Sequence, residues 1–204
     1  MHLKKPLFLF LFAVSLQAVY GQSKIDTPKT HYKTYSNIND LRDQQAKDHI
    51  TKLWYVDSLF NYRVAVPEWL KLKETNSRFM FGGTLAPVNG VENAIVIKAF
   101  SKKDYVDIQA FKDYVIGDWT YMTHPKWSSE ALCYGQKELN LFENIGYCCR
   151  ASNAWRNHIY TCTYVLVETK TAFLWIDYTS TPPLYDINEK KFEEFMNGFE
   201  KTNF

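Results

Sequence analysis

The sequence lacks the short motifs that mark the common catalytic and nucleotide-binding sites. It holds no Gly-x-Ser-x-Gly, no His-Glu-x-x-His, no glycine-rich phosphate loop and no Gly-x-Gly-x-x-Gly. These patterns place a serine nucleophile, a zinc ion or the phosphates of a nucleotide. The adjacent Gly82 and Gly83 indicate a strand irregularity instead. We therefore expect a protein that is not an enzyme and that carries no cofactor.

Long apolar segments and excess charge are also missing. No segment after residue 21 has the roughly 20 apolar residues that a membrane-spanning helix needs. The chain has 24 basic and 22 acidic residues, and removal of Lys4 and Lys5 with a leader would leave 22 of each. A neutral chain has no basic face to attract nucleic acid or an anionic membrane. We expect neither nucleic acid nor stable membrane insertion.

The first 21 residues have the three-part pattern of a secretory signal peptide. A basic start at Lys4 and Lys5 precedes an apolar run from Leu7 to Leu16, and small or modest residues lead to Gly21. We predict cleavage after Gly21 and a mature chain that begins at Gln22. The pattern predicts export to the periplasm or to the extracellular space.

The mature chain has an even number of cysteines, which in an oxidising compartment indicates two disulfides. They are Cys133, Cys148, Cys149 and Cys162. A zinc site that adds His124 and His158 is the alternative, but the spacing does not match paired Cys-x-x-Cys knuckles. We therefore predict disulfides and no metal.

The expected strands around the cysteines suggest how they pair. A hairpin centred near Trp155 would place Cys149 opposite Cys162. Neighbouring residues on a strand point to opposite faces, so Cys148 would face away and could meet Cys133. This predicts the pairs Cys149–Cys162 and Cys133–Cys148. A vicinal Cys148–Cys149 bond with Cys133–Cys162 is the alternative.

We predict that residues 22–52 form a flexible, partly helical lead-in segment and that residues 53–204 form a single domain. Strand patterns of alternating apolar residues, bounded by turn residues, dominate this domain. They cover 53–56, 59–66, 77–86, 94–100, 131–137, 145–152, 159–168 and 172–180. An Asn89-Gly90 pair predicts a hairpin turn between the third and fourth strands.

Two helices interrupt these strands. Capping-box spacings predict one helix that begins near Ser101 and ends near Gly117, and another from Glu189 to Glu200. The second carries an apolar stripe that we assign to the core, made of Phe192, Phe195, Met196 and Phe199. The order of strands, helix, strands and helix lacks βαβ alternation. It predicts an α+β fold, a mainly antiparallel sheet flanked by helices.

The chain resembles PsbP-like domains over about residues 53–199. Leu59–Trp69 matches their opening strand, which runs into Pro, one residue and Trp. Ala94–Lys98 leads to a helix in the same way, and a closing strand, Thr-Pro, then Tyr185-Asp186 and a Phe-rich helix follow. The resemblance implies an α-β-α sandwich used for binding or assembly, usually without catalysis. The four cysteines and a ring-rich loop depart from it.

Two regions are candidates for a contact surface because Trp, Tyr and Arg are enriched among binding hot spots. The first is the ring-rich loop after the first long helix, and the second is the tip of the last predicted hairpin. Their residues are Trp119, Tyr121 and Trp127 in the loop, and Trp155, Arg156 and His158 at the tip.

The hypothesis favoured by these features is an exported, non-catalytic domain that binds another protein. A narrower alternative is an immunity or inhibitor protein that neutralises a toxin or hydrolase in the same compartment. A third hypothesis is a binder of carbohydrate or another small ligand through its aromatic rings.

Overall fold

The computed structural model describes residues 33–47, 53–73, 80–88, 91–116, 131–155 and 158–203. The predicted signal peptide lies outside these ranges. The described residues form β1 Lys33–Tyr35, α1 Ile38–Gln45, β2 Leu53–Asp57, β3 Tyr62–Val66, β4 Lys71–Leu72, β5 Met80–Val88, β6 Val91–Ser101, α2 Ile108–Ile116, β7 Ala131–Leu139, β8 Tyr147–Trp155, β9 His158–Glu168, β10 Ala172–Ser180, α3 Pro182–Asn197 and β11 Phe199–Lys201.

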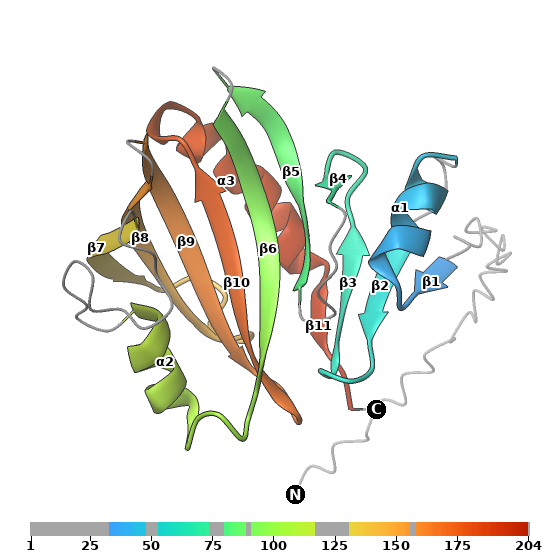
Figure 1. Ribbon diagram of the computed structural model, residues 1–204, viewed down its shortest axis with the longest axis horizontal. Coiled ribbons are helices and arrows are strands. Elements are labelled where there is room, and N and C mark those ends of the chain that lie inside the picture. The colour runs from blue at the N-terminus through green and yellow to red at the C-terminus, as the bar shows by residue number, and fades with distance from the viewer. Residues whose placement is uncertain are drawn as a thin grey trace, which may run out of the picture.

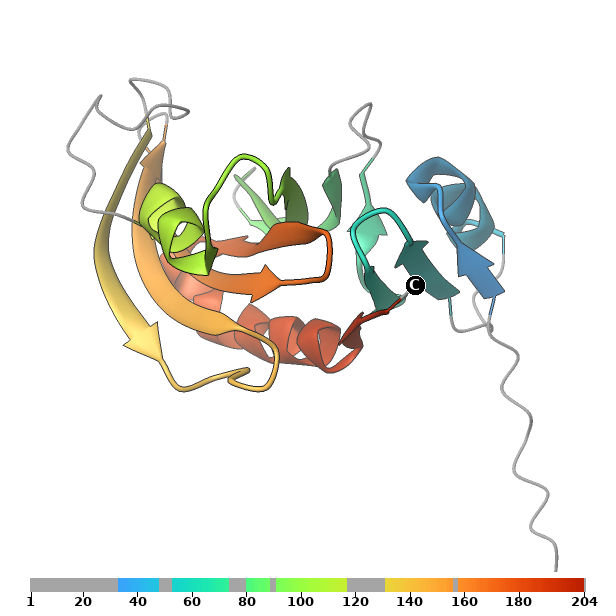
Figure 2. The ribbon, with the colours of Figure 1, turned by 90° about the horizontal axis from the view of Figure 1, so that it is seen from below.

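The strands form two sheets that lie side by side (Figure 1). The large sheet has seven strands in the order β4-β5-β6-β10-β9-β8-β7, and every neighbouring pair is antiparallel. It is strongly curved at the β7–β8 side (Figure 2). The small sheet has the order β1-β2-β3-β11, in which only β1 and β2 are parallel.

Helices cover both faces of the large sheet. In the view of Figure 1, α3 crosses behind β9 and β10, and α2 lies in front of the sheet near its lower end. A main core lies between α3, the back face and the small sheet, and a second core lies under α2. The predicted α+β class, an antiparallel sheet between helices, is confirmed.

The predicted strands match the structure where alternating apolar residues end at residues that favour a turn. β5 and β6 are joined at residues 89–90, the position of the predicted Asn-Gly turn. On β6 the residues Ile95, Ile97 and Ala99 are buried, and the residues between them are partly exposed. β10 has the predicted bounds. β6 buries one face on the main core, which is the reason for its period of two, whereas β10 also buries Phe173 and Trp175 in the second core.

Both longer helices begin at other residues than predicted. α2 starts at Ile108, because Asp107 accepts a hydrogen bond from the backbone of Ala110 at 2.8 Å and so caps the helix. α3 starts at Pro182, seven residues before the predicted start. Proline suits the first helical turn, where its missing N–H would have no intrahelical partner. Phe192 and Phe195 are buried on α3 as predicted.

The packed domain includes part of the segment 22–52 that the sequence presents as a lead-in. β1 pairs with β2, and α1 contributes Ile38 and Leu41 to the main core. At the other end of the chain, Phe199 is buried as predicted, but it lies on β11 and not on a helix. In the part of the chain that the structure describes, no helix is long and apolar enough to cross a bilayer.

The two sheets are tied together at the lower end of Figure 1. Thr171, in the turn between β9 and β10, donates a hydrogen bond at 2.7 Å to the carbonyl of Leu59 in the β2–β3 turn. Asn61 in that turn has a φ of 55°, a left-handed conformation that Asn tolerates better than most residues. Leu59 itself is 53% exposed. It lies at the end of the molecule opposite the β8–β9 tip.

Candidate functional site

The tip of the β8–β9 hairpin extends beyond β10 on one side, whereas β7 accompanies β8 up to Trp155 on the other. The pairing of β9 with β10 starts at Thr161, whereas its pairing with β8 reaches back to His158, opposite Trp155. His158 is exposed, and Ile159 is 56% exposed. The two side chains point to opposite faces of the hairpin, because neighbours on a strand alternate. The tip therefore presents a polar ring on one face and an apolar side chain on the other.

The structure tests only part of the predicted contact surface. The loop residues Trp119, Tyr121 and Trp127 lie outside the described residues, as does Arg156. Trp155 is placed at the end of β8, but the structure does not describe its side chain. Of the predicted tip residues, His158 is described in full, and its exposure is compatible with a contact role.

A polar strip runs across β6 and β10 on the face of the large sheet that carries α2. We call Lys98, Trp175, Asp177 and Thr179 the β6–β10 strip. The Lys98 amino group donates a hydrogen bond to Asp177 Oδ2 at 3.0 Å and lies 3.7 Å from the centre of the Trp175 ring. The Thr179 hydroxyl donates to Asp177 Oδ1 at 2.8 Å. Asp177 thus has a hydrogen-bond donor at each carboxylate oxygen.

Trp175 is the largest member of this strip, and it is almost enclosed. Its side chain is 7% exposed, and the edge of Tyr164 meets its ring at a centroid distance of 5.2 Å. The indole Nε1 is buried and has no hydrogen-bond partner. A buried donor without an acceptor costs about 1–3 kcal/mol. The strip therefore contains one unmet donor beside a satisfied ion pair.

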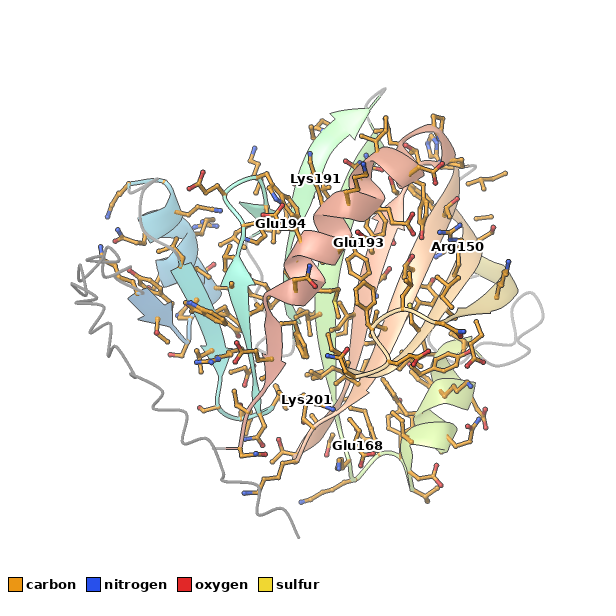
Figure 3. All side chains as sticks on the ribbon, turned by 180° about the vertical axis from the view of Figure 1, so that it is seen from behind. Arg150, Glu168, Lys191, Glu193, Glu194 and Lys201 are labelled. Carbon is orange, nitrogen blue, oxygen red and sulfur yellow. The ribbon has the colours of Figure 1, made fainter. Side chains whose placement is uncertain are left out.

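A second polar cluster lies on the other face of the sheet, beside α3. Tyr185 is 3% exposed, and its hydroxyl contacts the hydroxyl of Thr163 and accepts from Arg150 Nε at 3.1 Å. Arg150 also donates to Glu189 at 2.8 Å. Figure 3 shows Arg150 on the sheet next to α3. Burial raises the pKa of Tyr185, so its phenol stays neutral and joins the sheet to the helix.

The predicted Cys149–Cys162 disulfide is wrong. β8 and β9 are joined at residues 156–157, so the hairpin centre lies one residue later than the sequence indicated. Cys149 therefore faces Tyr164, and Cys162 faces Ala151. The two thiols share a face but are diagonal neighbours, and neither takes part in a disulfide.

The other predicted pairings fail for geometric reasons too. Cys133 faces Asn153, which lies five residues, or roughly 17 Å, along β8 from Cys148. Cys148 and Cys149 point to opposite faces and belong to different cores, and no vicinal bond forms. β8 lies between the strands that carry Cys133 and Cys162. These strands are therefore two strand spacings apart, roughly 9.5 Å in total, which exceeds the Cα–Cα distance that a disulfide spans.

The described thiols are poor nucleophiles and poor metal ligands. Cys148, Cys149 and Cys162 are each at most 2% exposed. Burial raises the pKa of Cys148 to about 12, which leaves almost no thiolate at neutral pH. Among the described residues, no three His, Cys, Asp or Glu side chains come together in a way that could hold a metal ion. His124 lies outside those residues.

Sequence reasoning missed both polar clusters. Lys98 and Asp177 are 79 residues apart, and only the pairing of β6 with β10 brings them together. Arg150 and Tyr185 are 35 residues apart. The one local signal was the spacing of four residues between Tyr185 and Glu189, which puts both on one side of a helix.

No protein-family model matches the chain. None of the curated proteins searched matches its sequence. Among solved structures, the chain is similar to PA94 of Pseudomonas aeruginosa, a protein of unknown function, with 16% identity, a TM-score of 0.44, and coverage of 70% of this chain and 92% of that one.

It is also similar to the cyanobacterial PsbP of Synechocystis, with 8% identity, a TM-score of 0.49, and coverage of 72% of this chain and 91% of that one. This match agrees with the PsbP-like resemblance of the sequence. Both likenesses concern the fold, and neither assigns a function to this chain.

Proposed function

We propose that this chain is an exported, non-catalytic domain that binds another protein through the tip of its β8–β9 hairpin. The observation that supports this proposal is the extension of the tip beyond β10, with His158 exposed and Ile159 56% exposed. A projecting tip can enter a partner without rearrangement of the sheet behind it. The sequence adds Trp155 and Arg156, of the types that dominate binding energy at interfaces.

The exposed side chain of Ile159 sets the size of the expected contribution to the binding free energy. Complete burial of an exposed aliphatic side chain of this size contributes about 1.5–3 kcal/mol. A carboxylate at the same place would lose this contribution and would need to be desolvated in the interface. Ile159→Asp should therefore weaken partner binding at least tenfold.

Leu59 offers a matched control. It is also a large aliphatic residue and is 53% exposed, but it lies at the opposite end of the molecule, beside the turn after β9. Leu59→Asp makes the same chemical change with the same effect on solubility. Both variants should fold, because neither side chain belongs to a core.

The experiment is capture of partners by the mature chain, residues 22–204, from extracts of its own cells and of competing cells. Wild type, Ile159→Asp and Leu59→Asp are compared by quantitative mass spectrometry, and their melting temperatures are recorded. The proposal predicts one protein that wild type and Leu59→Asp retain equally and that Ile159→Asp loses. Equal retention by all three variants would contradict a contact at the tip.

Export is a separate part of the proposal and rests on residues 1–21. The described thiols are compatible with an oxidising compartment, because their burial shields them from oxidants. Expression of the full chain in a bacterial host, followed by N-terminal sequencing of the exported fraction, should give Gln22 as the first residue. Retention of the intact chain in the cytoplasm would contradict export.

A further inference from the structure

We propose that the outer edge of β7 is a strand-addition site, to which the protein partner adds an extended segment that carries an acidic residue. This inference rests on the proposed function in one respect, that the partner is a protein, and it adds how that partner is held. We call the outer side of Ala131–Leu139 the β7 edge. Its length, its position beside the hairpin tip and the charge of Lys137 support the proposal.

The β7 edge is much longer than the other edges of the two sheets. β7 has nine residues, whereas the other edge strands, β4, β1 and β11, have two, three and three. Short edge strands are one way in which proteins avoid pairing with other chains. Within the part of the chain that the structure describes, no strand pairs with the outer side of β7. Because β7 bonds to β8 through alternate residues, the residues between them direct N–H and C=O groups outward, where an added strand can bond them.

The β7 edge begins at the hairpin tip. Ala131 pairs with Trp155, the last residue of β8, so a strand added to β7 would lie beside the tip. Figure 1 shows β7 at the margin of the large sheet. A bulge between Tyr134 and Lys137 divides the edge into a stretch at the tip and a stretch that ends at Leu139. Bulges disfavour indiscriminate edge pairing, so the added segment must fit this break in the ladder.

Lys137 determines the charge of the added segment. Its side chain is exposed and lies directly opposite Arg150, and like charges in such a pair repel each other. Glu189 pairs with Arg150, and among the described residues no acidic side chain pairs with Lys137. A carboxylate on a strand added at the other side of β7 would lie next to the Lys137 ammonium group. This pair would stabilise the complex, because opposite charges on neighbouring strands attract.

A second copy of this chain does not supply that carboxylate. The acidic residue of β7 is Glu138. In a symmetric antiparallel pair of β7 strands, the two-fold axis is perpendicular to the sheet, and each residue keeps its face. Lys137 and Glu138 are neighbours and point to opposite faces, so Lys137 of one copy never lies opposite Glu138 of the other. The charge of the edge therefore favours a different protein.

The test is selection of peptides that bind the mature chain from a random ten-residue library displayed on phage. We expect the enriched peptides to share one acidic residue among β-branched and aromatic residues. Lys137→Glu should lower the affinity of these peptides about threefold or more, because it replaces an attraction by a repulsion. It should not lower the melting temperature, because it also removes the repulsion from Arg150.

Lys170 offers a matched control. It is exposed and lies in the turn between β9 and β10, at the end of the hairpin strands away from the tip. Lys170→Glu makes the same reversal of charge far from the β7 edge. The affinity of the enriched peptides for Lys170→Glu should equal that for wild type.

Hydrogen exchange followed by mass spectrometry locates the bound peptide. In the free chain, the amides of residues 131–139 should exchange faster than those of β9, which has a strand on each side. An enriched peptide should slow the exchange of residues 131–139. It should leave the exchange of the edge strands β1 and β11 unchanged.

The remaining outcomes overturn the proposal. Enrichment of no peptide above the level on a bare support would contradict a strand-addition site. Exchange of residues 131–139 in the free chain as slow as that of β9 would show that the edge is already covered. Equal affinities of the peptides for wild type and Lys137→Glu would contradict the role of charge. None of these results depends on Ile159, so failure at the β7 edge and failure of the contact at the tip are distinguishable.

Discussion

Replacement of Tyr185 by Phe removes a single hydroxyl group from the cluster that joins α3 to the large sheet. That hydroxyl contacts Thr163, Arg150 and Glu189, while the ring remains packed against Tyr178. The shape of the core is preserved, so the change tests hydrogen bonding and not packing. The loss of free energy of unfolding depends on which former hydrogen-bond partners of this hydroxyl can be hydrated instead.

The two main partners differ in this respect. Thr163 is 1% exposed, so its hydroxyl would be left buried without Tyr185, at a cost of about 1–3 kcal/mol. The Arg150 side chain is 39% exposed, can be hydrated and keeps its bond to Glu189. We therefore expect Tyr185→Phe to lower the free energy of unfolding by about 1–3 kcal/mol, mainly through Thr163.

Thr163→Val should cost less, about 0.5–1.5 kcal/mol, because Tyr185 keeps its other two contacts. In the double variant neither hydroxyl is left unpaired, so its cost should be smaller than the sum by about 1 kcal/mol. Urea unfolding of the wild type, both single variants and the double variant measures this coupling. Additivity within about 0.3 kcal/mol would refute the argument that the two hydroxyl groups depend on each other.

Three further predictions concern buried groups. Cys148, Cys149 and Cys162 should not react with a thiol reagent in the native protein and should react fully in denaturant; fast reaction at pH 8 without denaturant would contradict their burial. Burial raises the folded-state pKa of Asp57. The protonated carboxyl group of Asp57 therefore stabilises the fold at pH values below its unfolded-state pKa of about 3.9, and this contribution is lost as the pH rises through the raised folded-state pKa. Asp57→Asn should abolish this pH-dependent change in the free energy of unfolding, measured by urea titrations across pH 3–7. Phe195→Asp should prevent folding, because it buries a carboxylate at a fully enclosed site; a cooperative melting transition like that of wild type would contradict this.

Local sequence rules predicted the strands well and the helix starts poorly. The alternation on β6 and the Asn89-Gly90 turn depend on neighbouring residues, which the sequence shows directly. The start of α3 was misplaced because Thr181-Pro-Pro read as the end of a strand, although the same prolines suit the first turn of a helix. The start of α2 was misplaced because Ser101 and Asp107 are both suitable caps, and only the structure shows that Asp107 is used.

The candidate sites depend on long-range pairing, which one sequence does not reveal. A change in the hairpin centre by one residue was enough to move Cys162 from Cys149 to Ala151. The shift did not change which face of β8 each residue points to, so the prediction that Cys148 faces away from Cys149 was confirmed. The ion pair of Lys98 and Asp177 required the register of β6 against β10. No local pattern near either residue indicates the other.

Site-specific photo-crosslinking tests the protein contact most directly. A photoreactive phenylalanine derivative is placed at Ile159 in one variant and at Leu59 in another, and each mature chain is irradiated in extracts of its own cells and of competing cells. The account predicts one covalent adduct of defined mass from position 159 and none of that mass from position 59. Adducts from both positions alike, or none from position 159 when a partner is captured, would contradict binding through the hairpin tip.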